Sequence, residues 1–254
     1  MAERRGGGVR RWYAGWTLWM VSASAAWAIP AFDEVRADFK PSDTLILSRE
    51  GEVLQRLRTD ATAFSTRHGS NSERHTEEDF SILKYCKNLQ ALDIGHNAVK
   101  DLSFLKDLPH LKVLILVDNQ FTDITPLAEL KELQYLELFY NHVEDVSALA
   151  GLNSLVDLNI CYNRIPDLHP LLGLTNLRRL WIYNSNDYNP EHKLDETMLA
   201  QLSQALPDTY IDSVSSSVEG GWREHPHFYT IQRIFAKDGQ YEPFEDVAPS
   251  GPEQ

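Results

Sequence analysis

The feature of the sequence that most restricts its fold is a 22-residue repeat. Four blocks, residues 89–110, 111–132, 133–154 and 155–176, align without an insertion or deletion, and each begins L-x-x-L-x-[IL]-x-x-N. A fifth block follows but carries Ser185 where the others have asparagine. Several aliphatic columns keep their register through all four periods, which is typical of a solenoid.

A single block is too small to bury its own apolar columns, so neighbouring blocks must stack. Over residues 67–212 the pattern resembles the leucine-rich repeats of internalins and other bacterial surface proteins. The resemblance implies an α/β solenoid, a leucine-rich-repeat arc with a parallel concave sheet. Each block would supply one short strand and return through a tight helical or extended segment.

Two polar columns run through the blocks. We expect the asparagine column to satisfy backbone groups where each strand turns away, as a structural ladder made of Asn97, Asn119, Asn141 and Asn163. An aspartate column follows it and should brace the next turn. A calcium ladder is the alternative interpretation, but one aspartate per block offers too few oxygen ligands. No metal and no cofactor is therefore predicted.

Alternation along a strand places every second side chain on the outside of the sheet. Aromatic residues gather there in the third to fifth blocks with polar neighbours, a composition seen in protein interfaces. The predicted partner-binding residues are Tyr135, Glu137, Phe139, Tyr140, Asn159, Tyr162, Arg179, Trp181 and Tyr183. Two alternatives remain: the aromatics only tile the sheet, or they pack beneath the C-terminal tail.

The N-terminus predicts a membrane signal. Residues 1–11 hold four arginines and one acid, and residues 12–32 carry no charge. As a helix, the second segment is about 31 Å long, close to the ~30 Å of a hydrocarbon core. Either it is an uncleaved single-pass transmembrane anchor with the repeats outside the cytoplasm, or it is a signal peptide and the protein is secreted.

A second resemblance follows this segment. The run from Phe32 to Ala37, then Lys40-Pro-Ser, then Thr44 to Leu54, is similar to the start of class-C bifunctional penicillin-binding proteins. These are inner-membrane enzymes that polymerise and cross-link peptidoglycan. Their catalytic motifs are missing: Ser81 and Lys84 match Ser-x-x-K, but no Lys-Thr-Gly partner follows. The chain is thus no enzyme, or alternatively a truncated or fused relative that lacks the catalytic domains.

The residues that follow the last repeat are predicted to form a cap on the stack. Residues 194–206 have helical spacing and Tyr210–Val214 suggests a last strand, so the repeat domain with its caps spans 67–214. Residues 33–66 form a lead-in or linker, and residues 215–254 a tail with a short helix that starts near Trp222.

The amino-acid composition limits the kinds of partner that the chain is expected to bind. The net charge of −13 argues against nucleic acid, because nucleic-acid binders carry basic patches. Cys86 and Cys161 fall on different columns several blocks apart, so we expect no disulfide. Together these observations predict a monomeric, non-enzymatic module that is displayed outside the cytoplasmic membrane and binds another protein.

Overall fold

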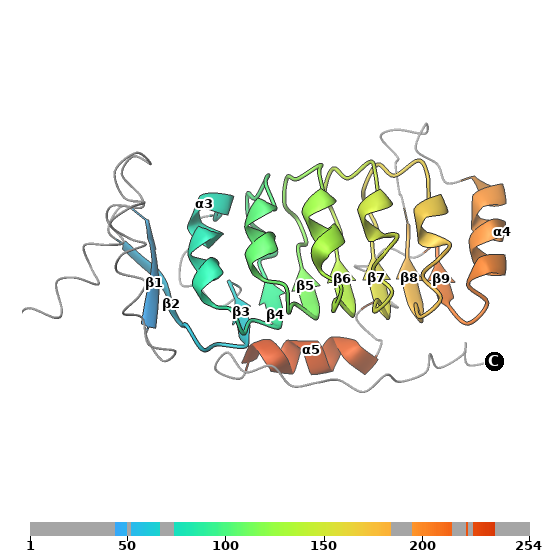
Figure 1. The fold of residues 1–254 in the computed structure, drawn as a ribbon. Coiled ribbons are helices and arrows are strands. Elements are labelled where there is room, and N and C mark those ends of the chain that lie inside the picture. The colour runs from blue at the N-terminus through green and yellow to red at the C-terminus, as the bar shows by residue number, and fades with distance from the viewer. Residues whose placement is uncertain are drawn as a thin grey trace, which may run out of the picture.

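The computed structural model describes residues 44–49, 52–66, 74–183, 195–214, 222 and 226–236. Within these residues, seven short strands form one parallel sheet in chain order, β3 to β9. Figure 1 shows them side by side, with the return segments from β3 to β9 on one side of the sheet. The predicted leucine-rich-repeat solenoid with a parallel sheet is confirmed.

The strands repeat with the period of the sequence. Ala91 pairs with Val113 and Val113 with Tyr135, so each step across the sheet is one 22-residue block. The strands are β3 (Ala63–Ser65), β4 (Ala91–Asp93), β5 (Val113–Ile115), β6 (Tyr135–Glu137), β7 (Asp157–Asn159), β8 (Arg179–Trp181) and β9 (Tyr210–Asp212).

The return segments contain single turns of 3-10 helix. They are η1 (Ser81–Tyr85), η2 (Ser103–Asp107), η3 (Thr125–Glu129), η4 (Ser147–Leu149) and η5 (His169–Leu171). A 3-10 turn is compact, so it lets the chain reverse within one block. Proline at the start of η3 and η5 supplies the backbone angle that such a turn needs.

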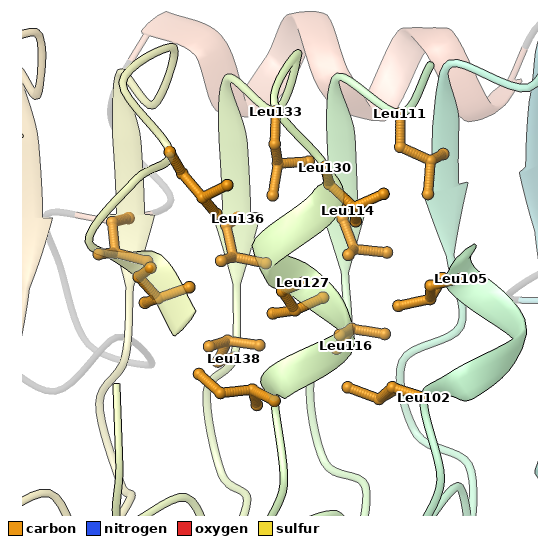
Figure 2. Packing of buried hydrophobic residues seen from close by; sticks show 14 of the residues in the cluster. Leu102, Leu105, Leu111, Leu114, Leu116, Leu127, Leu130, Leu133, Leu136 and Leu138 are labelled. Carbon is orange, nitrogen blue, oxygen red and sulfur yellow. The ribbon is translucent and has the colours of Figure 1, made fainter. Parts of the chain in front are cut away.

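The repeated leucines fill the space between the strands and these helical turns. Figure 2 shows Leu114 and Leu116 from β5 and its exit facing Leu127 and Leu130 of the return segment. All four are fully buried, as are their counterparts in the neighbouring blocks. The leucine core therefore runs continuously along the stack, and removal of one large side chain would leave a cavity.

Both ends of the described stack are covered. At the start, β1 (Thr44–Arg49) and β2 (Glu52–Arg58) form an antiparallel pair, and α3 (Glu77–Phe80) precedes η1. At the far end, α4 (Glu196–Ala205) packs on η5, which confirms the predicted terminal helix, and β9 adds the predicted last strand. A further helix, α5 (Pro226–Ala236), lies across the strands on the opposite side of the sheet from η1 to η5 (Figure 1).

Several predicted segments lie outside the described residues: the basic residues 1–11, the 12–32 span and the end of the tail after residue 236. In the part that the structure does describe, no helix combines the length and apolar character needed to cross a bilayer. Strand β3 falls within residues 33–66, the segment predicted as a linker, and it pairs directly with β4.

Candidate interaction surface

The outer face of the sheet, turned away from the leucine core, is mostly buried. Each strand contributes its first and third residues to this face, and from β4 to β8 these residues are 0–6% exposed. They are Ala91, Asp93, Val113, Ile115, Tyr135, Glu137, Asp157, Asn159, Arg179 and Trp181. In an open solenoid this face would meet solvent, so another part of the chain covers it.

The cover consists of α5 and Trp222. Trp222 is itself buried, and its ring lies 5.3 Å from that of Tyr135 and 4.9 Å from that of Trp181, centroid to centroid. Ile231 and Ile234 of α5 join the same apolar cluster as Val113 and Ile115. The solenoid thus has two apolar cores, one on each side of its sheet.

A buried ionic group lies between α5 and the sheet. Asp157 accepts a hydrogen bond from Arg179 of the adjacent strand at 2.8 Å, and His227 Nδ1 contacts its other carboxylate oxygen. All three side chains are at most 3% exposed. A buried charge pair seldom adds net stability, but the loss of one partner is costly. The group therefore fixes where α5 sits on the sheet.

The outer face also carries acids that have local partners. Asp93 accepts from Ser65 Oγ at 3.3 Å and from the backbone N–H of Gly95 at 3.1 Å. Asp212 accepts from the backbone N–H of Val214 at 2.9 Å. The hydroxyl of Tyr135 donates to Glu137. Among the described residues, the strands thus place four buried carboxylates and one buried guanidinium, that of Arg179, on the outer face.

Beyond the strand ends, four aromatic side chains form a contiguous row in which Tyr140 is exposed and the other three are partly buried against the outer apolar core. This aromatic ladder comprises Phe139, Tyr140, Tyr162 and Tyr183. The ring centroids of Phe139 and Tyr162 lie 5.1 Å apart and those of Tyr162 and Tyr183 lie 5.7 Å apart, both edge to face. Tyr140 stands 6.3 Å from Tyr162 and is 57% exposed.

The ladder is held by an unusual backbone. Tyr140 and Tyr162 have φ of 58° and 54°, in the left-handed region. His96 and Asp118 occupy the same place in earlier blocks, with φ of 60° and 51°. This conformation costs a residue with a Cβ roughly 1–2 kcal/mol. Because it recurs in every complete block, the turn geometry imposes it, and the side chain there is free to vary.

The nine predicted partner-binding residues therefore divide into two groups. Tyr135, Glu137, Asn159, Arg179 and Trp181 are buried, so they cannot touch a partner while α5 is in place. The physical reason is that α5 and Trp222 pack on them, which is the predicted alternative of packing beneath the tail. Phe139, Tyr140, Tyr162 and Tyr183 are partly or largely accessible. Their role in binding stays a prediction.

The predicted binding residues did not include Asp157, Trp222 or His227, although alternation along the strand places Asp157 on the outer face. One signal was available, because Asp157 and Arg179 are 22 residues apart in one column and must be neighbours. For His227 no signal existed, since it lies outside the repeat and reaches Asp157 only through the path of the tail.

The asparagine column links successive turns. Asn119 Nδ2 donates to the carbonyl groups of Ile94 and Leu116 at 3.0 and 3.2 Å, and its Oδ1 accepts from the N–H of Val99. Asn163 repeats the pattern with Leu138, Ile160 and Val143. Each asparagine thus satisfies backbone groups that a buried turn would leave without partners.

The aspartate column holds the start of each helical turn. Asp123 accepts from both the N–H and the hydroxyl of Thr125, and Asp101 does the same with Ser103. The hydroxyl donation, followed by the N–H donation, lowers the pKa of both carboxyl groups from 3.8. In the described chain no group of three or more His, Cys, Asp or Glu residues is placed to hold a metal ion.

The remaining nucleophile candidates are held in structural roles. Cys86 and Cys161 are buried free thiols, and desolvation raises the pKa of each to about 12, so both are protonated at neutral pH. Ser81 donates its hydroxyl to the carbonyl of Glu78 at 2.8 Å, while Lys84 Nζ lies over the ring of Tyr85.

Comparison with known families identifies the repeats. Residues 87–129 and 109–154 match the family described as leucine-rich repeats (2 copies). These blocks are leucine-rich repeats, as the column pattern predicts. A search of curated proteins returns no match.

Solved structures of similar fold include internalins and another bacterial leucine-rich-repeat protein. The internalin InlF of Listeria monocytogenes is 20% identical, with a TM-score of 0.44, over 64% of this chain and 51% of its own. Internalin C2 of the same species is 29% identical, with a TM-score of 0.39, over 62% and 76%. A leucine-rich-repeat protein of Leptospira interrogans is 23% identical, with a TM-score of 0.40, over 51% and 38%. The chain thus spans about half the length of InlF. The resemblance to penicillin-binding proteins finds no support among these comparisons.

Proposed function

We propose that this protein is a protein-binding module and that it engages its partner through the aromatic ladder. The observation that carries the proposal is the contiguous row of partly or largely accessible rings at Phe139, Tyr140, Tyr162 and Tyr183. The turn does not require an aromatic residue at positions 140 and 162, because His96 and Asp118 occupy the same left-handed position in other blocks. Rigid aromatic side chains supply much of the binding energy in protein interfaces.

The net charge of the chain after residue 58 favours a particular kind of partner. Residues 59–254 hold 15 basic and 30 acidic residues. A partner surface with apolar and basic side chains would complement both the aromatic rings and the negative electrostatic potential of the chain. Cations also bind the faces of aromatic rings.

Site-specific photo-crosslinking tests the proposal in cells that express the chain. A benzophenone amino acid at position 140 or 162 should give the same discrete protein adduct. Placed at Glu129, which lies in η3 on the other side of the core, it should give none. Loss of the adduct on Tyr162→Gly, with the probe at position 140, would assign the contact to the ladder. Absence of adducts from both ladder positions, or an equal adduct from position 129, would contradict the proposal.

We further propose that the module works outside the cytoplasmic membrane, anchored or secreted. Support comes from the arginine-rich start and the uncharged residues 12–32. Cell fractionation followed by N-terminal sequencing tests this directly. Recovery from the soluble cytosol with the original N-terminus intact would exclude export.

A further inference from the structure

Trp222 and α5, the described part of the tail, contact the sheet at widely separated points of the stack. The helix α5 crosses several strands (Figure 1) and contacts β3 and β4, while His227 at its start reaches Asp157 of β7. Trp222 precedes the helix and lies against Tyr135 of β6 and Trp181 of β8. The place of Trp222 is therefore fixed by the docking of α5 as well as by the rings around it.

The start of α5 is anchored by a buried ionic group. Asp157, Arg179 and His227 are at most 3% exposed, and both carboxylate oxygens of Asp157 have partners in the group. Disruption of such a group is costly, because the remaining charges stay desolvated. The variant His227→Glu would place a second carboxylate against Asp157 and should undock the tail without removing any aromatic ring.

Trp222 belongs to the apolar cluster that supports the aromatic ladder. Its ring is 2% exposed and meets that of Trp181 edge to face at 4.9 Å. Phe139, Tyr162 and Tyr183 pack against the same cluster and keep part of their surface accessible. These three rings thus lie between the residues that the tail covers and the solvent.

A small side chain provides space for the central ring of the ladder. Phe139, Cys161 and Tyr183 follow one another at the spacing of one block, at the ends of successive strands, and Cys161 is fully buried. Tyr162 meets both flanking rings edge to face, at 5.1 Å from Phe139 and 5.7 Å from Tyr183. Tyr140 contacts Phe139 and Tyr162 at 6.1 and 6.3 Å. The ladder is therefore one packed unit rather than four independent rings.

Packing against a buried cluster restricts these rings before any partner arrives. Immobilising a side chain on binding lowers affinity, so rings that are already held in place bind more tightly than mobile ones. Removal of the large Trp222 side chain would leave a cavity in the cluster and allow the ladder rings to move.

From these contacts we infer that Trp222 is a positioning residue of the aromatic ladder, and that docking of the tail holds the rings in the arrangement that a partner meets. The inference depends on the proposed binding role of the ladder. It also makes the two events reciprocal, because a partner that prefers the ordered ladder stabilises the docked tail by the same factor.

Fluorine NMR of the full chain with a single 3-fluorotyrosine at position 162 tests the positioning. The wild-type signal should lie away from its position in the urea-unfolded chain. Both Trp222→Ala and His227→Glu should move it toward the unfolded position, whereas Trp222→Phe, which keeps a ring in the site, should move it less than either. The result for His227→Glu is free of the ring-current change that loss of the indole itself would cause.

Two control variants should leave the signal at its wild-type position. Tyr229→Glu adds the same charge on the exposed side of α5. Leu105→Ala opens a cavity in the leucine core of the first block, so it lowers stability at a distance from the ladder. A signal that stays in place in both Trp222→Ala and His227→Glu, or that moves as far in Leu105→Ala, would overturn the inference. Should Trp222→Ala fail to melt cooperatively, His227→Glu and Trp222→Phe decide.

Photo-crosslinking from position 140 separates this inference from the proposed function. With the benzophenone probe there, Trp222→Ala should lower the adduct yield about fivefold, and Trp222→Phe should retain most of it. An unchanged yield in Trp222→Ala would overturn the link between tail and partner binding. If the wild-type chain gives no adduct, the proposed function fails, and the fluorine signal of position 162 still decides whether the tail positions the ladder.

Discussion

At the scale of single residues, the molecule depends on side chains that complete the turns between strands. The asparagine column and the left-handed residues before it occur at one place in each block. Asparagine is required there because its amide both donates and accepts, whereas the preceding residue needs only to tolerate a positive φ. The first position is therefore structural and the second is available for function.

Replacement of Asn119 by alanine should destabilise the repeats by about 2–4 kcal/mol. The change removes the donor to Ile94 and Leu116 and the acceptor for Val99, and it leaves those groups buried. Urea denaturation measures the loss. Gln120→Ala, at the exposed next residue, is the control and should change stability by less than about 0.5 kcal/mol.

Tyr140 offers a different prediction, because its φ is 58°. Tyr140→Gly relieves about 1–2 kcal/mol of backbone strain but forfeits roughly 0.5–1 kcal/mol in chain entropy and some ring contact, so stability should change by less than ~1 kcal/mol. Tyr140→Val forces a branched side chain into the same conformation and should cost about 2 kcal/mol. Equal stability of the two variants would show that the positive φ is not imposed by the turn.

At the scale of elements, each helical turn is anchored by an aspartate from the preceding segment. The sequence predicts only that the aspartate column braces these turns. In the structure the carboxylates of Asp101 and Asp123 accept from the N–H two residues later, and the hydroxyls of Ser103 and Thr125 donate to the same oxygens. The hydroxyl therefore orients the capping carboxylate.

Asp123→Ala should lower the free energy of unfolding by about 1 kcal/mol at neutral pH, the typical effect of a lost cap. Its folded pKa lies below 3.8, so the stabilisation is complete above that value and is lost as the pH falls through the folded pKa. The difference in unfolding free energy between the wild type and the variant should accordingly become smaller below about pH 3.8. Urea midpoints at neutral and acid pH measure it, with Glu129→Ala as the exposed control. A gap that widens in acid would contradict the assignment.

The two faces of the sheet differ in how far the sequence predicts them. The leucine columns specify the inner face, because identical spacing in four blocks allows one mode of burial. The sequence does not predict whether Tyr135 and Trp181 are exposed or covered. Aromatic side chains on the outer face are compatible with binding a partner protein and equally with packing beneath the chain's own C-terminal tail. The choice depends on His227 and Trp222, which the 22-residue period does not constrain.

The same reasoning explains which site residues were predictable. Tyr140 and Tyr162 follow from alternation past the strand end, and they are accessible. Asp157 has the polar character of a solvent-facing residue, yet it is buried because Arg179 and His227 pair with it. Long-range pairs of this kind have no local sequence signature.

At the scale of the whole molecule, the chain is a one-dimensional stack, and its parts contact mainly their neighbours. In-frame removal of residues 111–132 takes out one complete block and should leave a protein that unfolds cooperatively at a lower urea midpoint. Removal of residues 111–121 deletes half a block, brings leucine columns out of register and should abolish the cooperative transition. Circular dichroism during denaturation separates the two. Loss of cooperativity in both would mean that the blocks are not interchangeable units.

The central claim is that the tail divides the outer aromatic residues into a covered group and an accessible ladder. Hydroxyl-radical footprinting with mass spectrometry tests this division on the unmodified protein. Tyr140, 57% exposed, should be oxidised at least tenfold faster than Tyr135, which is 0% exposed, and Trp181 and Trp222, each 2% exposed, should be protected despite the high reactivity of indole. Oxidation of Tyr135 and Trp181 as rapid as that of Tyr140 would show that α5 does not cover the sheet, and the account of both surfaces would fail.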